Sequence, residues 1–431
     1  MREQRQFYGW RVVGAAFVLG IFGWGLGFYG PPIYLQTICA TRGWPVALVS
    51  AAVTLHYLTG AAVVANLPRF YRRFGVAAVT RAGAFAAAGG VAGWALAAQP
   101  WQLFAAVLVS GAGWVTLSGA AINAIVSPWF VRRRPVALSA AYNGASVGGV
   151  IFSPLWVAAI AALGFPAAAG AIGAVAIVTV WLLAGRYFAV SPAQLGMQPD
   201  GDPPAATHAL PRPAAAEEPL PVARLWRDRR FLTLAAGFAL RLFAQVGLLA
   251  HLFSLLVPTL GDSNAGLAAG GATGVAIAAR MWVGRRLDPG RDRRLFACGN
   301  YMMQATGAVA LLVAAGGNVP LLLIGVVLVG AGIGNTTSLP PLIAQADFAA
   351  ADVARVVPLV IAVSQACAAF APAAFGLLRG LAPTADAAGI APLVFAAAAL
   401  LYGAAILALL AGRRPPQRSA AGRRADVPTS A

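Results

Sequence analysis

Twelve long apolar stretches recur between Trp10 and Ala411, separated by short polar connections. A bilayer core about 30 Å thick requires roughly 20 apolar residues for each helix that crosses it. A chain that is 60% hydrophobic and only 10% charged has more apolar surface than a water-soluble core can bury. These features predict an all-α integral membrane protein with twelve transmembrane helices.

The connections alternate in their arginine content. The N-terminal segment, every second connection and the C-terminal segment carry most of the arginines, whereas the other connections hold only Arg42 and Arg379. Because positive residues stay on the cytoplasmic side of a membrane, this alternation predicts cytoplasmic N- and C-termini. We therefore expect a multi-pass protein of the bacterial inner (plasma) membrane.

The apolar stretches form two sets of six, separated by a segment rich in proline, alanine and charge, a composition typical of disordered linkers. We predict a six-helix bundle over 1–188, a cytoplasmic linker over 189–228, a second six-helix bundle over 229–412 and a disordered basic tail over 413–431. A six-plus-six layout with a central linker is typical of transporters whose halves rock against each other. The expected spans are 10–34, 45–67, 76–98, 101–126, 136–161, 165–188, 231–257, 264–284, 295–315, 319–343, 355–378 and 388–411.

The net charge of +18 could suggest a nucleic-acid partner. The arginines are scattered over short connections and form no single face, so we expect no nucleic-acid binding. Their distribution instead favours contact with anionic membrane lipids.

Residues for enzymatic chemistry are scarce. The chain has no lysine, which excludes a nucleotide-binding Walker A loop and a Schiff-base nucleophile. Its three histidines lack metal-ligand spacing, and Cys39, Cys298 and Cys367 are isolated. We expect no enzyme activity, no cofactor and no metal. A channel is disfavoured because no filter-like repeat is present, and a non-transporting sensor remains an alternative.

Five segments have a recognisable sequence pattern: Phe7–Arg11, Pro128–Arg134, Asn143–Gly149, Gln245–His251 and Gly332–Thr337. With the six-plus-six layout, they resemble the major facilitator superfamily, and within it the branch of monocarboxylate transporters and oxalate/formate antiporters. The resemblance implies alternating access and a substrate-binding arginine in the eighth span, which Arg280 matches. Where that branch carries an acid one turn earlier, this chain has Ala276.

The superfamily also carries a loop signature after its second and eighth spans, a glycine and an acid followed by basic residues, which steadies one conformation. Gly284, Asp288 and Arg291 match it after the eighth span. After the second span the acid is missing, and Arg72 stands in its place. We therefore expect a conformational loop motif in the second half only.

Ionisable residues inside spans are costly and usually functional. Arg241 lies about 15 Å into the seventh span, near the middle of the membrane. Arg280 lies one turn from the arginine-rich end of the eighth span, where the alternative is that it snorkels to the interface. Since the acids can all be placed outside the spans, we expect both guanidinium groups to bind an anionic substrate; backbone carbonyls and water are the alternative partners.

Other polar residues in the spans are weaker candidates for the same site. Gln245 shares a helix face with Arg241, as Thr273 and Ala276 do with Arg280. His56 is open to substrate contact, titration or a simple hydrogen bond between helices. The remaining candidates for substrate binding are Tyr57, Asn123, Asn143, Asn335 and Gln365.

The sequence therefore predicts a secondary active transporter that moves a small organic anion, a mono- or dicarboxylate, by alternating access. The alternative is an efflux carrier for amphipathic or drug-like compounds. We expect the partners to be the anionic substrate and membrane lipids, and the protein to function as a monomer.

Overall fold

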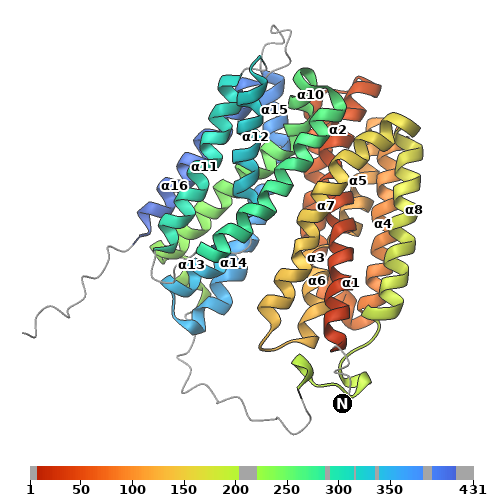
Figure 1. Cartoon of the computed structure of the whole chain (residues 1–431), viewed down its shortest axis with the longest axis vertical. Coiled ribbons are helices and arrows are strands. Elements are labelled where there is room, and N and C mark those ends of the chain that lie inside the picture. The colour runs from red at the N-terminus through yellow and green to blue at the C-terminus, as the bar shows by residue number, and fades with distance from the viewer. Residues whose placement is uncertain are drawn as a thin grey trace, which may run out of the picture.

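The computed structural model describes residues 7–202, 221–286, 292–314, 317–334, 339–381 and 391–413, whose regular structure is entirely helical (Figure 1). Ten helical stretches among them are long and apolar enough to cross a membrane. One of these, Arg229–Arg280, crosses twice, and the shorter helix Val319–Ile333 together with Leu339–Asp347 completes a further crossing. Twelve crossings result, which confirms the predicted fold class.

The first half of the chain contributes six crossings. Its helices are α1 (Tyr8–Gly27), α2 (Gly30–Arg42), α3 (Val46–Phe74), α4 (Val76–Leu96), α5 (Pro100–Val115), α6 (Gly119–Val126), α7 (Arg134–Leu163) and α8 (Phe165–Leu183). A short helical turn, η1 (Ser127–Trp129), lies between α6 and α7. Three more follow α8: η2 (Ala184–Phe188), η3 (Ala193–Leu195) and η4 (Pro199–Gly201).

The second half contributes the other six. Its helices are α9 (Val222–Leu225), α10 (Arg229–Arg286), α11 (Arg293–Ala314), α12 (Val319–Ile333), α13 (Leu339–Asp347), α14 (Ala350–Ala368), α15 (Ala371–Leu381) and α16 (Pro392–Ala411). The helix α10 is in fact two spans, because Gly261 interrupts it with a φ of 74° and a ψ of 165°. A positive φ favours glycine, and here it reverses the chain at the far end of the molecule.

Several crossings are broken near their middle. The first crossing breaks at Phe28 and Tyr29, directly before Gly30 and two prolines that begin α2. Proline lacks a backbone donor and tolerates only the first turn of a helix, so the break falls just before Pro31. A second break separates α5 from α6 at residues 116–118. Broken spans expose backbone groups and polar side chains inside the membrane, where transporter sites commonly form.

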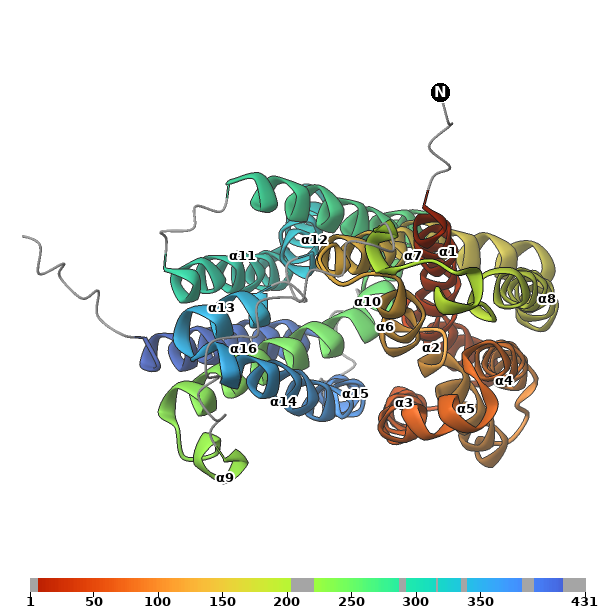
Figure 2. The same ribbon diagram turned by 90° about the horizontal axis from the view of Figure 1, so that it is seen from below.

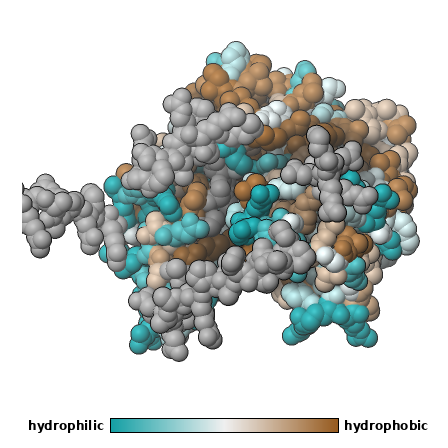
Figure 3. Space-filling view, turned by 60° about the horizontal axis from the view of Figure 1, so that its bottom comes forward, coloured by the Kyte–Doolittle hydropathy of each residue, from teal (hydrophilic) through white to brown (hydrophobic). Residues whose placement is uncertain are grey.

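The two ends of the molecule differ in charge. The arginine-rich end comprises the start of α1, the end of α3, the turn before α7 and the starts of α10 and α11. The arginine-poor end comprises the opposite helix ends, with Arg42 and Arg379. Figure 3, which turns the arginine-rich end forward, shows hydrophilic residues gathered there and hydrophobic residues on the flanks. This surface fits a protein embedded in a bilayer.

The cores show how the two halves are joined. At the arginine-poor end, one apolar cluster runs through both halves and includes Trp94 and Trp156 from the first and Leu252 and Phe375 from the second. At the arginine-rich end, each half has its own cluster among the described residues, one around Trp129 and one around Phe231, Tyr301 and related side chains. Viewed from the arginine-rich end in Figure 2, α10 lies beside α7, and α15 lies beside α3. The halves are therefore closed together at the arginine-poor end.

The beginning of the expected linker is folded. The Asp200 carboxylate accepts hydrogen bonds from the backbone N–H groups of Val131, Arg132 and Arg133, at 2.8–3.2 Å. Arg132 also pairs with Asp202 over 2.6 Å. Residues 199–202 are thus attached to the turn that precedes α7, because the Asp200 carboxylate accepts hydrogen bonds from three backbone N–H groups of that turn. Residues 203–220 of the linker and the tail beyond Arg413 lie outside the described residues, whereas α9 (Val222–Leu225) forms within the last part of the linker.

Candidate functional site

The two halves meet along a seam between α7 and the second span of α10. A Cβ atom placed on Gly266 would lie 3.3 Å from Val157 Cβ, and one on Gly270 would lie 3.1 Å from the Pro154 ring. The next close approach toward the arginine-rich end is at Gly149, where an added Cβ atom would contact Thr273. The helices run antiparallel at van der Waals distance because small residues recur on both.

Arg280 lies on this seam closest to the arginine-rich end. Its Nη1 donates to Asn143 Oδ1 over 3.0 Å, and its Nε donates to the Gly334 carbonyl oxygen over 2.5 Å. The side chain is partly buried and directed across the seam. Two candidates that the sequence places in different halves are therefore in direct contact. Arg280 does not extend to the interface in this conformation.

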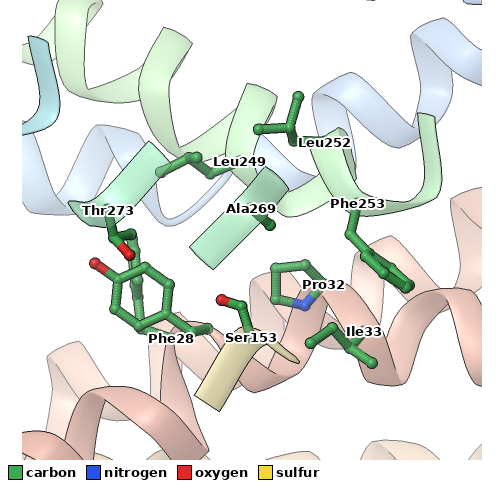
Figure 4. Close-up of a pocket in the computed structure, with 10 residues that line it drawn as sticks. Phe28, Pro32, Ile33, Ser153, Leu249, Leu252, Phe253, Ala269 and Thr273 are labelled. Atoms are coloured by element: carbon green, nitrogen blue, oxygen red, sulfur yellow. The ribbon is translucent and has the colours of Figure 1, made fainter. Parts of the chain in front are cut away.

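A small cavity lies between the halves, further toward the arginine-poor end than Arg280. Phe28, Tyr29 and Ser153 line it from the first half, and Phe253 and Thr273 line it from the second (Figure 4). Its volume of about 30 Å³ has room for one or two waters in this conformation. Tyr29 also lies within electrostatic range of Arg280. Arg280 and the cavity both lie between the two halves, and on α10 they are separated by the two turns from Thr273 to Arg280.

Arg241 is placed differently from Arg280. Its side chain is 0% exposed inside the second half. Its Nε donates to Gln304 Oε1 over 3.1 Å, its Nη2 donates to the Gly332 carbonyl over 2.8 Å, and its guanidinium lies 5.8 Å from the centre of the Tyr301 ring. Gln245, one turn further along α10, is also buried. In this conformation Arg241 joins α10 to α11 and α12.

His56 is held within the first half. Its side chain is 1% exposed and stacks on Trp114. Nε2 lies 3.0 Å from the Gly27 carbonyl oxygen, so this nitrogen carries the proton, and Nδ1 lies 2.9 Å from Ser110 Oγ. These contacts fix His56 between α1, α3 and α5. Of the alternatives for this residue, the geometry matches the hydrogen bond between helices.

The other candidates are dispersed. Tyr57 packs against Phe28 at the boundary of the halves, in a small cluster with residues of α10 and α14. Asn123 is exposed and accepts a hydrogen bond from Ser127. Gln365 is exposed on α14. The structure therefore brings only Tyr57 near the aromatic side of the cavity.

The substrate-binding candidate Asn335 lies outside the described residues. So do Asp288 and Arg291 of the predicted loop motif, and for Gly284 only its place in α10 is described. The neighbouring residues form a charged cluster at the arginine-rich end. Arg294 pairs with Asp347 over 2.7 Å while its side chain is only 3% exposed, and Asp292 pairs with Arg413. The pKa of Asp292 lies below its usual value because the hydrogen bond from Arg413 and two backbone donors outweigh the opposing effect of burial.

Tyr29 and Gln304 are site residues that the sequence did not single out. Tyr29 is the residue before α2, and its only signal was the Gly30-Pro31 pair that interrupts the apolar stretch. Gln304 sits on the buried face of α11 and binds Arg241. A polar residue in the middle of a span was the available signal, since such residues usually hydrogen-bond to another helix.

Residues 12–372 match the family model described as Major Facilitator Superfamily. The chain belongs to the major facilitator superfamily. No curated protein matches it.

Solved structures with a similar fold include transporters of this superfamily. The nucleoside transporter NupG, in a mutant form, superposes with a TM-score of 0.68 at 12% identity, covering 94% of this chain and 100% of that one. A bacterial homolog of the human lysosomal transporter Spinster, in an inward-facing and occupied conformation, superposes with a TM-score of 0.65 at 14% identity, covering 96% and 100%. At such identities the likeness concerns the fold alone.

Proposed function

We propose that this superfamily transporter carries a small organic anion across the bacterial inner membrane by alternating access, with Arg280 as the residue that binds the anionic group. The observation that carries the proposal is the environment of Arg280. It is a permanent cation between the two halves, and its hydrogen-bond partners are neutral, the Asn143 amide and the Gly334 carbonyl. An anion that accepts two hydrogen bonds is a stronger partner for a guanidinium than a neutral amide.

The arrangement of the halves supports transport through this position. The halves share one core at the arginine-poor end and have separate cores at the arginine-rich end. With the arginine-rich end in the cytoplasm, this is the conformation that receives or releases substrate on the cytoplasmic side. Rocking about the seam would then expose Arg280 to the other side.

Arg241 takes a different role in this proposal from the one expected from the sequence. Its guanidinium is already hydrogen-bonded to Gln304 and to the Gly332 carbonyl inside the second half. We assign it to holding α10, α11 and α12 together. The substrate then meets one cation and not two.

The sequence resembles the branch of monocarboxylate transporters and oxalate/formate antiporters, and this resemblance supports an anionic substrate. The anionic substrate and its class of carboxylate are both proposals. The decisive experiment is thermal unfolding of the purified protein over a library of carboxylates, because a ligand that binds the folded state raises its apparent stability. Hits should be lost in Arg280→Gln and recovered poorly in Arg280→Lys, since a point charge does not reproduce the two-pronged contact.

The control is Arg72→Gln at the arginine-rich end, which should retain every hit. If the Arg280→Gln protein still binds the same carboxylates, the anion proposal is wrong. Stabilisation by cationic or neutral amphipathic compounds in place of carboxylates would favour the efflux alternative.

A further inference from the structure

The outer flank of the first half is built by α4 and α8, which pack against each other. In both Figure 1 and Figure 2 these two helices lie on the side of the first half that faces away from α11 and α16. Near the arginine-rich end, three large apolar side chains are exposed on them: Phe85, Trp181 and Leu182. In a bilayer, exposed apolar side chains at this position contact the acyl chains of lipids.

Arg81 is part of this flank. Its guanidinium carbon lies 4.5 Å from the centre of the Trp181 ring. Phe85, one turn further along α4, contacts the same ring edge-on, with 5.9 Å between the ring centres. A Cβ atom placed on Gly185 would lie 2.5 Å from Arg81 Nη2, so this glycine leaves room for the guanidinium against the turn η2. The indole and the turn together hold the cation at the edge of the apolar flank.

The charge of Arg81 is not compensated within the part of the chain that the structure describes. Its guanidinium makes no ion pair or hydrogen bond there, and its Nε is buried without an acceptor. The acids described in the first half, Asp200 and Asp202, are attached to the turn before α7. Arg186 adds a second exposed cation directly after Gly185. Because donors without acceptors are costly, these cations favour an anionic acceptor from outside the chain.

The depth of Arg81 indicates where that acceptor comes from. Arg81 is five residues into α4, about 8 Å from Val76 along the helix axis, and Phe85 is about 6 Å deeper. Tryptophan rings such as that of Trp181 are enriched at the boundary between lipid headgroups and acyl chains. A phospholipid places its phosphate at this boundary and its acyl chains on the apolar side, whereas a free phosphate ion would leave the apolar side chains uncovered.

We infer that Arg81, Trp181 and Arg186 form a binding site for the phosphate headgroup of an anionic phospholipid in the leaflet on the arginine-rich side. The acyl chains of this lipid lie over Phe85 and Leu182. A phosphate accepts charge-assisted hydrogen bonds from guanidinium groups, and anionic lipids are attracted to arginines next to the membrane. The site lies within the first half and does not depend on the proposed function.

The test uses the purified full-length protein in an uncharged detergent and measures its unfolding temperature during titration with phosphatidylglycerol. Phosphatidylglycerol should raise this temperature more than phosphatidylcholine does, because a ligand of the folded state stabilises it. In Arg81→Gln the phosphatidylglycerol concentration for half of the maximal rise should increase about fivefold or more. Arg81→Lys should recover only part of the loss, since an ammonium group neither stacks flat on an indole nor binds phosphate through two prongs.

Two matched controls accompany these variants. Arg133→Gln removes an exposed arginine at the same end, in the turn before α7, and should change the half-maximal concentration less than about twofold. Trp181→Leu removes the aromatic support of Arg81 and should weaken phosphatidylglycerol binding about threefold. Its control is Trp101→Leu, an exposed tryptophan at the arginine-poor end. Unfolding without lipid establishes that each variant is folded.

Three outcomes would overturn the inference. The first is an unfolding temperature that does not respond to phosphatidylglycerol, or responds equally in the parent protein, Arg81→Gln and Trp181→Leu. The second is an equal loss in Arg133→Gln, which would show general attraction to positive charge and no defined site. The third is inorganic phosphate stabilising the protein through Arg81 as strongly as phosphatidylglycerol does, which would identify a free anion as the ligand.

Discussion

Arg280 Nη1 and Asn143 Oδ1 lie 3.0 Å apart and join the two halves of the transporter by a hydrogen bond. Asn143 belongs to α7 and Arg280 to α10, so the bond spans the seam along which the halves must move. Under the proposed function, an anion that binds Arg280 competes with Asn143 for the same guanidinium. The bond would then connect substrate binding with the contact between the halves.

Replacing Asn143 with Asp should turn the competitor into an anion. The fixed carboxylate would pair with Arg280, so the apparent affinity for the transported anion should fall about tenfold or more. Asn143→Ala removes the competitor and should retain binding. Affinity measured by thermal stabilisation checks both variants, and equal affinities in Asp and Ala variants would contradict the competition.

Replacing Arg241 with Met should reduce stability and spare binding. The change removes the donors to Gln304 and the Gly332 carbonyl, and each buried acceptor left without a donor costs about 1–3 kcal/mol. The unfolding temperature should therefore drop markedly while the anion affinity of the folded fraction changes less than threefold. Complete loss of anion binding by a folded Arg241→Met protein would return this arginine to the substrate site.

His56→Gln tests whether a protein side chain couples transport to protons. Since both ring nitrogens of His56 are engaged with Ser110 and Gly27, we expect anion exchange in vesicles to proceed without a pH gradient, before and after the substitution. The variant should be less stable, because Gln does not stack on Trp114 in the same way. Uptake that requires a pH gradient in the parent protein, and loses this requirement in His56→Gln, would identify His56 as the coupling group.

A disulfide between Val157→Cys and Gly266→Cys should arrest transport. The expected Cβ separation of 3.3 Å is close to the range that disulfides adopt, and the bond would hold the halves together at the arginine-poor end. In a background lacking Cys39, Cys298 and Cys367, oxidation should stop transport, and a reductant should restore it.

The matched control for this cross-link is Ala88→Cys with Gly173→Cys, which lie 3.1 Å apart within the first half. This pair should form a disulfide without arresting transport. Continued transport by the oxidised Val157/Gly266 pair would show that the seam stays closed during the cycle.

The attachment of residues 199–202 should depend on pH through Asp200. Burial opposes the charged form, but the backbone N–H groups of Arg132, Arg133 and Val131 outweigh it and lower the pKa of Asp200 below its usual 3.8. A lowered pKa in the folded state means that the stabilisation is present above the usual value and is lost as the pH falls through the folded-state pKa. At neutral pH, limited proteolysis within 189–202 should be slow in the parent protein and faster in Asp200→Ala. Asp228→Ala serves as the control, and equal cleavage rates in all three proteins would contradict the role of Asp200.

The sequence predicted the spans well because apolar length and arginine placement are properties of each segment alone. It did not predict the breaks at Tyr29 and after Val115, since apolar residues continue on both sides of each break. It proposed Arg280 and Asn143 separately, but their contact depends on how two rigid halves sit against each other. For Arg241 it considered substrate, carbonyls and water, and did not consider Gln304 on another helix of the same half. Distances between spans far apart in the chain are set by packing, which a single sequence does not display.

The seam between α7 and α10 also has a kinetic consequence. At glycines 266, 270 and 274 the backbone of α10 faces α7, so few side chains interlock across the seam. Two such surfaces separate without rotamer changes or the opening of large voids, so the activation barrier for turnover receives little contribution from this interface. The slow step of the cycle should then lie elsewhere, at the shared core around Trp156 and Phe375, where bulky side chains must part.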